Sequence, residues 1–95
     1  MKAYEIDFKE VKTYMNFYQT IIKAMGFPEW CGKNLDAIWD MLTWEVETPA
    51  IIYIKGLDCL PKDLKEKREL LLKVFNDAHD WYERYGKCLE IKIVD

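Results

Sequence analysis

The hydrophobic positions change their period along the chain, and each change marks a new element. Near the N-terminus, Tyr4, Ile6 and Phe8 alternate with Glu5 and Asp7. Alternation at every second residue is the pattern of a strand with one buried face. We therefore expect a first strand here.

Residues 13–26 follow the helical period instead. Apolar side chains recur at spacings of three and four residues, which aligns them along one side of a helix; they are Tyr14, Phe17, Tyr18, Ile21, Ile22 and Met25. Thr13 is a residue type that caps helix N-termini, and Gly26 suits the left-handed turn after the last residue. The proline- and glycine-containing segment 27–34 predicts a connecting loop.

A second, shorter helix is predicted from Leu35 to about Trp44, with Asn34 as its N-cap. Its apolar residues fall within about 100° of the helix circumference; they are Leu35, Ile38, Trp39 and Leu42. The neighbouring sector holds Thr43, Asp36, Asp40 and Lys33.

The C-terminal half completes an alternating order of strands and helices. Residues 50–56 form an apolar, β-branched run that predicts a buried strand. A long helix is expected over residues 63–85, ended by Gly86, with an inward side made of Leu71, Val74, Phe75, Ala78, Tyr82 and Tyr85. Residues 88–95 alternate again and predict a third strand. The order β-α-α-β-α-β predicts an α/β fold, with a small three-stranded parallel sheet packed by helices, and a single domain over residues 1–95.

The net charge and its uneven distribution along the chain limit the classes of partner that the protein can bind. The chain has a net charge of −3 and a pI near 5.2, which argues against binding to nucleic acid or to an anionic membrane. Residues 29–47 hold five acidic residues against one lysine, a net charge of −4, so the remainder carries +1. The five acids are Glu29, Asp36, Asp40, Glu45 and Glu47. We also predict no signal peptide and no membrane-spanning segment.

The residues that carry chemistry favour neither catalysis nor metal binding. Cys31, Cys59 and Cys88 are widely spaced, which predicts free thiols in a reducing cytoplasm rather than disulfides. His79 is the single histidine, no ligand cluster has a recognisable metal spacing, and the four glycines form no phosphate-binding loop. We therefore expect no enzyme, no cofactor and no metal. A small enzyme that uses Asp36 and Asp40 as an acid–base pair stays a remote hypothesis, because such a pair needs a cleft.

Asp36 and Asp40 raise a question of their own, since like charges four residues apart oppose a helix by about 0.2–0.5 kcal/mol. The helix dipole favours Asp36 near the helix start, but Asp40 lies a turn further in. Trp39 lies beside the pair, and Trp30 and Trp44 flank the helix. Two readings remain open: a solvated acidic face with incidental aromatics, or a face that binds a partner. Aspartates one helical turn apart have their Cβ atoms about 5–6 Å from each other. That scale resembles adjacent phosphates of a nucleic acid strand, so a basic pocket that handles RNA would attract this helix.

Residues 27–43, "FPEWCGKNLDAIWDMLT", together with Glu47 and Pro49, resemble the signature of the barstar family, the intracellular inhibitors of barnase-type ribonucleases. The resemblance implies a barstar-like fold with a three-stranded parallel sheet and helices packed against it. It also implies that the second helix and the loop before it plug the active site of a ribonuclease. Pro49 matches a position where the family has a cis proline.

The resemblance assigns roles to residues one by one. Asp40 corresponds to the central carboxylate, which meets the arginines and the histidine that handle substrate phosphate, and Asp36 supplements it. Trp30 stands where the family has a tyrosine that packs on the catalytic histidine, and Asp77 aligns with a glutamate that reaches a basic residue of the enzyme. The expected partner-binding set is Trp30, Asn34, Asp36, Trp39, Asp40, Thr43, Trp44, Glu47 and Asp77.

Three departures from the family pattern bear on the choice of target. Trp44 replaces a glycine beside the binding helix, Asp77 is one methylene shorter than the family's glutamate, and Cys31 replaces an aromatic residue. Together they suggest a different or reshaped ribonuclease. The alternative is a non-enzymatic regulatory module that uses the same acidic face on another protein. In either case we expect a cytoplasmic protein that is a monomer when free.

Overall fold

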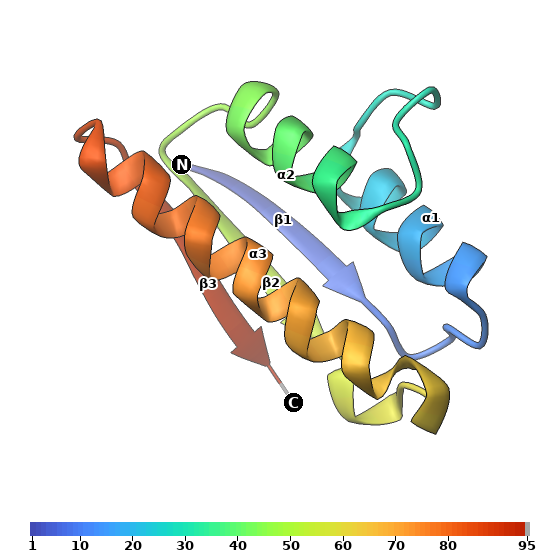
Figure 1. The fold of residues 1–95 in the computed structure, drawn as a ribbon. Coiled ribbons are helices and arrows are strands. Elements are labelled where there is room, and N and C mark those ends of the chain that lie inside the picture. The colour runs from blue at the N-terminus through green and yellow to red at the C-terminus, as the bar shows by residue number, and fades with distance from the viewer. Residues whose placement is uncertain (95) are drawn as a thin grey trace.

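The computed structural model describes residues 1–94 and shows the expected order of elements (Figure 1). The strands β1 (Lys2–Asp7), β2 (Ala50–Lys55) and β3 (Leu89–Val94) form one parallel sheet in the order β1-β2-β3. The helices are α1 (Tyr14–Met25), α2 (Leu35–Trp44) and α3 (Lys65–Arg84), and two short 3₁₀ turns, Leu57–Cys59 and Lys62–Leu64, precede α3. The predicted α/β class and parallel sheet are confirmed. Asp95, which the third predicted strand included, lies outside the described residues.

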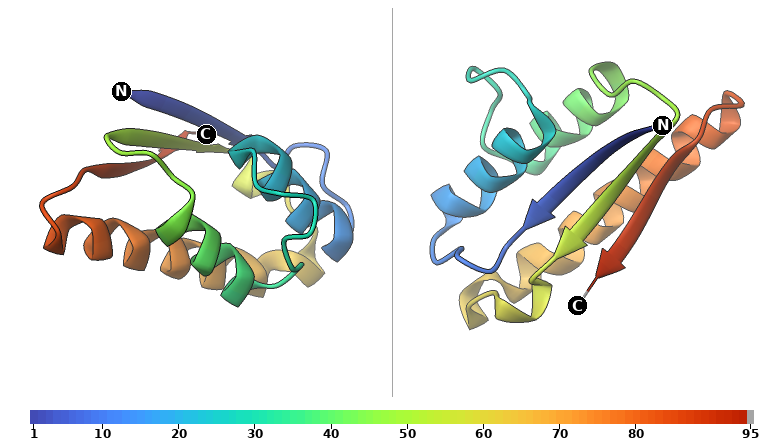
Figure 2. Two further views of the ribbon diagram at one scale, coloured as in Figure 1. Left: turned by 90° about the horizontal axis from the view of Figure 1, so that it is seen from above. Right: turned by 180° about the vertical axis from the view of Figure 1, so that it is seen from behind.

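The helices lie on one side of the sheet and leave its other face open within residues 1–94 (Figure 2). Along β2, Ala50, Ile52 and Ile54 are fully buried, whereas Ile51 and Tyr53 are only half-buried. The sequence predicted a strand buried throughout. That prediction holds for one face only, because no helix of the described chain packs on the other.

The ends of α1 match the predicted caps. The Thr13 hydroxyl accepts the backbone N–H of Asn16 at 3.1 Å, and Gly26 adopts the left-handed conformation with φ of 71°. The other five apolar residues of the helix face the core as expected, but Tyr14 is 50% exposed, so its predicted core position is wrong. Its ring lies 5.5 Å from the Lys67 ammonium, because the first turn of α1 faces the start of α3 rather than the core.

The long third helix is shorter than predicted at both ends. A 3₁₀ turn occupies its expected start, and Gly86, with φ of 70°, turns the chain just after Arg84. Tyr85 was expected in the core but is 65% exposed, because it lies beyond the last helical residue and packs on Trp81 instead. Among residues 1–94, none of the helices combines the length and apolar character needed to cross a membrane.

Candidate functional site

The start of α2 is set by the residues just before it. The Asn34 side-chain oxygen accepts the backbone N–H of Ala37 at 2.8 Å, so Asn34 caps the helix as predicted. Gly32 fits closely here, since a Cβ there would stand 3.1 Å from both the Ala37 Cβ and the Asn34 amide nitrogen and would require one of them to shift slightly. The cap places Asp36 in the first turn, where the helix dipole favours a negative charge.

The two sides of α2 have opposite character. Ile38 and Leu42 are fully buried, and burial of each contributes about 1.5–3 kcal/mol. Asp36 and Asp40 are exposed, and within residues 1–94 no ion pair includes either carboxylate. The helix is therefore held by its apolar side, while the repulsion between the two aspartates has no counter-charge in the described part of the chain.

The last turn of α2 is tied to α3 by a hydrogen bond that sequence reasoning missed. The Tyr82 hydroxyl donates to the Leu42 carbonyl at 2.5 Å and lies 3.4 Å from the carbonyl of Val46. Leu42 lies in the last helical turn, where carbonyls lack a partner within the helix. Tyr82 is 3% exposed, and this burial raises the pKa of its phenol. The sequence indicated only that Tyr82 faces the core, since no local pattern reports a bond across 40 residues.

Two tryptophans project into solvent around α2. Trp44, the last residue of the helix, is 83% exposed, and Trp30, in the loop before it, is 74% exposed. Trp39 differs, because it is half-buried and packs against the core. Trp30 and Trp44 therefore contribute little to the core, and their exposed rings are available to a partner.

Thr43 and Glu47 complete the predicted set on and after α2. The Thr43 hydroxyl donates within the helix, to the carbonyl of Trp39 at 3.0 Å or of Asp40 at 3.2 Å, which leaves its oxygen as an acceptor. Glu47 is exposed and precedes a cis Thr48–Pro49 bond, which confirms the cis proline that the resemblance implied.

Asp77 approaches this surface from α3. Its carboxylate pairs with the Lys73 ammonium at 2.9 Å. A hollow of about 330 Å³ brings Asp77 together with Trp39 of α2, and its lining also includes Asp80, Trp81 and Arg84. Asp80 was missed at the sequence level, although its spacing of three residues from Asp77 on a helix was a usable signal.

Cys31 lies in the loop between α1 and α2 and is buried. Burial raises the pKa of its thiol; the nearby Lys33 opposes this effect and Asp40 adds to it. The Cys31 sulfur donates weakly to the Gly32 carbonyl at 3.6 Å. A buried thiol with a raised pKa favours the protonated form, which is typical of a structural rather than a reactive cysteine.

Comparison with known proteins identifies the family. A family model described as Barstar (barnase inhibitor) matches residues 1–94. The chain belongs to the Barstar family. A Bacillus subtilis (strain 168) protein named "Putative ribonuclease inhibitor YrdF" is 26% identical over 80 residues, which cover 84% of this chain and 88% of that protein.

The Barstar match spans all the described elements, so it agrees with the fold as well as with the segment 27–43. Barstar membership and the inhibitor-named relative point to a ribonuclease-inhibitor-like role rather than to an enzyme, with a ribonuclease as the general class of partner. The geometry fits that role. Asp36 and Asp40 lie exposed on a helix surface, an arrangement that can bind a cationic surface.

Proposed function

We propose that this chain is a cytoplasmic inhibitor of a barnase-like ribonuclease, of the secreted or toxin type, and that α2 and its preceding loop occlude the enzyme's active site. The observation that carries the proposal is the pair of exposed carboxylates, Asp36 and Asp40, which form no ion pair within residues 1–94. A ribonuclease holds its substrate phosphates with cationic side chains. Those side chains would supply the missing counter-charge.

Asp40 carries the central contact in this proposal, and Asp36 adds a second negative charge one turn away. The exposed indole of Trp30 stacks against the enzyme's active-site imidazole, while the Asn34 amide and the Thr43 oxygen offer hydrogen bonds beside it. Inhibition is steric and electrostatic, and no bond is made or broken.

A second contact area extends the interface to α3. Asp77 exchanges its partner Lys73 for a basic side chain of the enzyme, and Trp39 lines the hollow that this side chain enters. Glu47, exposed after α2, adds to the negative field on the same part of the chain. The free protein is a monomer in this proposal.

Trp44 favours a particular kind of ribonuclease and also motivates a second candidate function. An 83% exposed indole at the end of α2 requires an apolar recess on the partner beside its cationic site. A ribonuclease without such a recess would clash with it. If the partner that offers the recess is not a ribonuclease, the chain is a non-enzymatic regulatory module with the same binding face.

The test is capture and inhibition with two charge-matched variants. The wild-type chain is used to isolate a partner from the source cell, and the captured protein is assayed for ribonuclease activity with and without inhibitor. Asp40→Asn and Glu10→Gln each remove one negative charge, and both residues are exposed. Removing one member of a buried interfacial charge pair weakens binding by about 2–5 kcal/mol, and complexes of this family are among those measured. We therefore expect Asp40→Asn to weaken inhibition by about 30- to 5,000-fold, and Glu10→Gln to change it little.

The outcomes separate the candidates. A captured protein without ribonuclease activity that still depends on Asp40 supports the regulatory module. Equal effects of Asp40→Asn and Glu10→Gln contradict both candidates, because binding would then follow net charge alone. Turnover of a substrate by the isolated chain would revive the enzyme hypothesis.

A further inference from the structure

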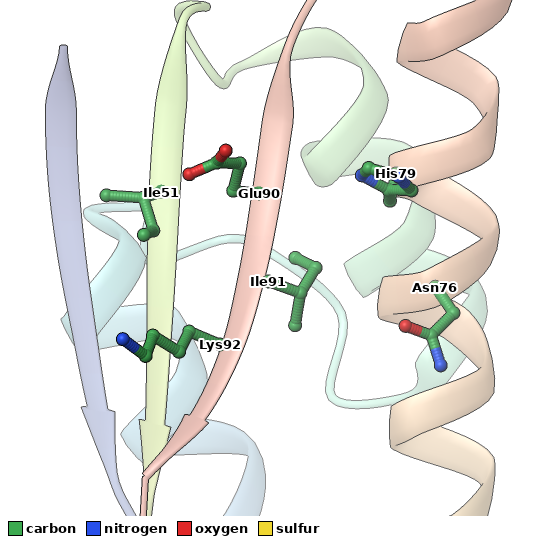
Figure 3. Close-up of a pocket in the computed structure, with 6 residues that line it drawn as sticks. All are labelled: Ile51, Asn76, His79, Glu90, Ile91 and Lys92. Carbon is green, nitrogen blue, oxygen red and sulfur yellow. The ribbon is translucent and has the colours of Figure 1, made fainter.

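His79, the chain's single histidine, lies on α3 and has a contact to each of its two ring nitrogens. His79 lies on the side of α3 that faces β3 and lines a hollow of about 380 Å³ there (Figure 3). Its Nδ1 lies 2.5 Å from the Leu89 carbonyl oxygen. A carbonyl oxygen can only accept a hydrogen bond, so Nδ1 carries the proton. In the neutral ring, Nε2 is then left with the lone pair.

The Nε2 atom faces a second electron-rich atom. It lies 3.3 Å from the Glu83 carboxylate oxygen Oε2, one helical turn away. A lone pair and a carboxylate at this distance repel unless a proton or a cation lies between them. Two ligands bound tetrahedrally to zinc at about 2.0–2.1 Å stand about 3.3–3.4 Å apart. The observed separation matches that distance, and it also matches an ion pair in which Nε2 carries a proton.

Asp80 brings a third donor to the same place. Ligand atoms of His79, Asp80 and Glu83 all lie within 4.8 Å of one another. Asp80 and Glu83 line an open hollow of about 390 Å³, and the side chains of His79 and Glu83 are 42% and 72% exposed, so an ion can enter from solvent. Arg84 lines the same hollow.

We propose that His79 Nε2, Glu83 and Asp80 form a Zn²⁺-binding site on the C-terminal half of α3. Imidazole and carboxylate are ligands that zinc accepts, and three protein ligands leave one position open. A zinc-bound histidine usually donates its other ring N–H to a carbonyl or a carboxylate, which is the role of Leu89 here. The sequence predicted no metal site because His-Asp-x-x-Glu is not a recognised ligand spacing. The fold adds the carbonyl that orients the ring.

The proposal is tested by titrating the intact chain with Zn²⁺, followed by calorimetry and by NMR of the imidazole nitrogens. Because there is one histidine, its two ring nitrogens report on the site without ambiguity. We expect one Zn²⁺ per chain, a large shift of the Nε2 resonance, and an Nδ1 that stays protonated. Loss of even an outer-sphere partner weakens metal sites by about 10- to 100-fold. Glu83→Gln should therefore reduce the affinity by at least about tenfold, and Asp80→Asn by less.

Matched control variants test whether other carboxylates or thiols of the chain bind the Zn²⁺ instead. Glu66→Gln, at an exposed position near the start of α3, should leave the affinity unchanged. Cys59→Ser and Cys88→Ser remove the two exposed thiols and should also leave it unchanged. The proposal is overturned if no Zn²⁺ binds, if binding depends on a thiol rather than on Glu83, or if Zn²⁺ binds without shifting Nε2.

Discussion

Asp36 and Asp40 look alike in the sequence, but their positions on α2 set them apart. Asp36 lies in the first turn, directly after the Asn34 cap, where the helix dipole offsets its charge. Asp40 lies one turn further along, beyond most of that effect, and is exposed without a counter-ion in the described chain. The structure thus accounts for Asp36 through helix stability. It offers no such stabilisation for Asp40, which is the residue on which the proposed function depends.

Tyr82→Phe tests the bond that ties α2 to α3. The substitution keeps the ring but removes the hydroxyl, which leaves the buried Leu42 carbonyl without its donor. Such a loss costs about 1–3 kcal/mol, measurable by urea unfolding at neutral pH. Tyr85→Phe is the matched control on an exposed ring and should change the stability little. Equal stability of the two variants would show that the Tyr82 bond contributes nothing.

The difference in stability between wild type and Tyr82→Phe should depend on pH. Burial raises the pKa of Tyr82, so the folded state favours the neutral phenol. Its contribution to stability is complete below the unfolded-state pKa, about 10, and is lost as the pH rises from there through the folded-state pKa. The stability advantage of wild type over Tyr82→Phe should therefore narrow above about pH 10. Comparing the two chains also cancels the buried Cys31 thiol, whose pKa is raised as well.

At the scale of elements, α2 is a short helix that is fixed at three points. Asn34 caps its start, Ile38 and Leu42 anchor its middle, and Tyr82 holds its last turn. A helix of this length is marginal in isolation. If Asp40 binds a partner as proposed, we expect these contacts to reduce the loss of conformational entropy on binding.

Asn34 is expected both to cap α2 and to contact the partner, and two substitutions separate these roles. Asn34→Ala removes the cap and should lower the free energy of unfolding by about 0.5–2 kcal/mol. Asn34→Ser keeps a capping oxygen, so its stability should stay near that of wild type while its affinity for the ribonuclease falls. The measurements are urea unfolding and an inhibition titration. Wild-type affinity in Asn34→Ser would mean that the residue only caps the helix.

At the scale of the whole molecule, the chain is electrically asymmetric. Residues 29–47 carry −4 and the remainder +1, and α2 lies inside the acidic segment. In the proposed function we expect such a field to steer a cationic partner toward α2 and to accelerate association more than it slows dissociation. The expected partner, a ribonuclease with a basic active site, is complementary to it.

Salt should therefore act mainly on the association rate. Raising the ionic strength from about 0.02 to about 0.5 M shortens the screening length severalfold, and we expect the association rate constant to fall by about tenfold or more. The dissociation rate should change less. Surface plasmon resonance over a salt series measures both rate constants. Asp40→Asn should weaken the salt dependence of the association rate constant more than Glu10→Gln does. A dependence carried by dissociation alone would contradict electrostatic steering.

Sequence patterns predicted well wherever the deciding contact is local. Four predictions that depend only on neighbouring residues are confirmed. They are the caps Thr13 and Asn34, the left-handed Gly26 and the alternation in β1. Tyr14 and Tyr85 were misplaced because periodicity indicates which side of a helix is apolar but not how far along the helix the core extends. The Tyr82 bond, the hollow between Trp39 and Asp77, and the His79 cluster join residues from different elements or depend on another element's backbone.

The sequence by itself determined the order of elements, the parallel α/β class, the acidic segment and the family signature, because each depends on spacing along one stretch of chain. Only the tertiary structure decided which side of the sheet stays open, how α2 is held, and which acids lack a counter-charge. Those outcomes depend on distances between residues far apart in the chain, and packing of the helices on one face of the sheet sets those distances.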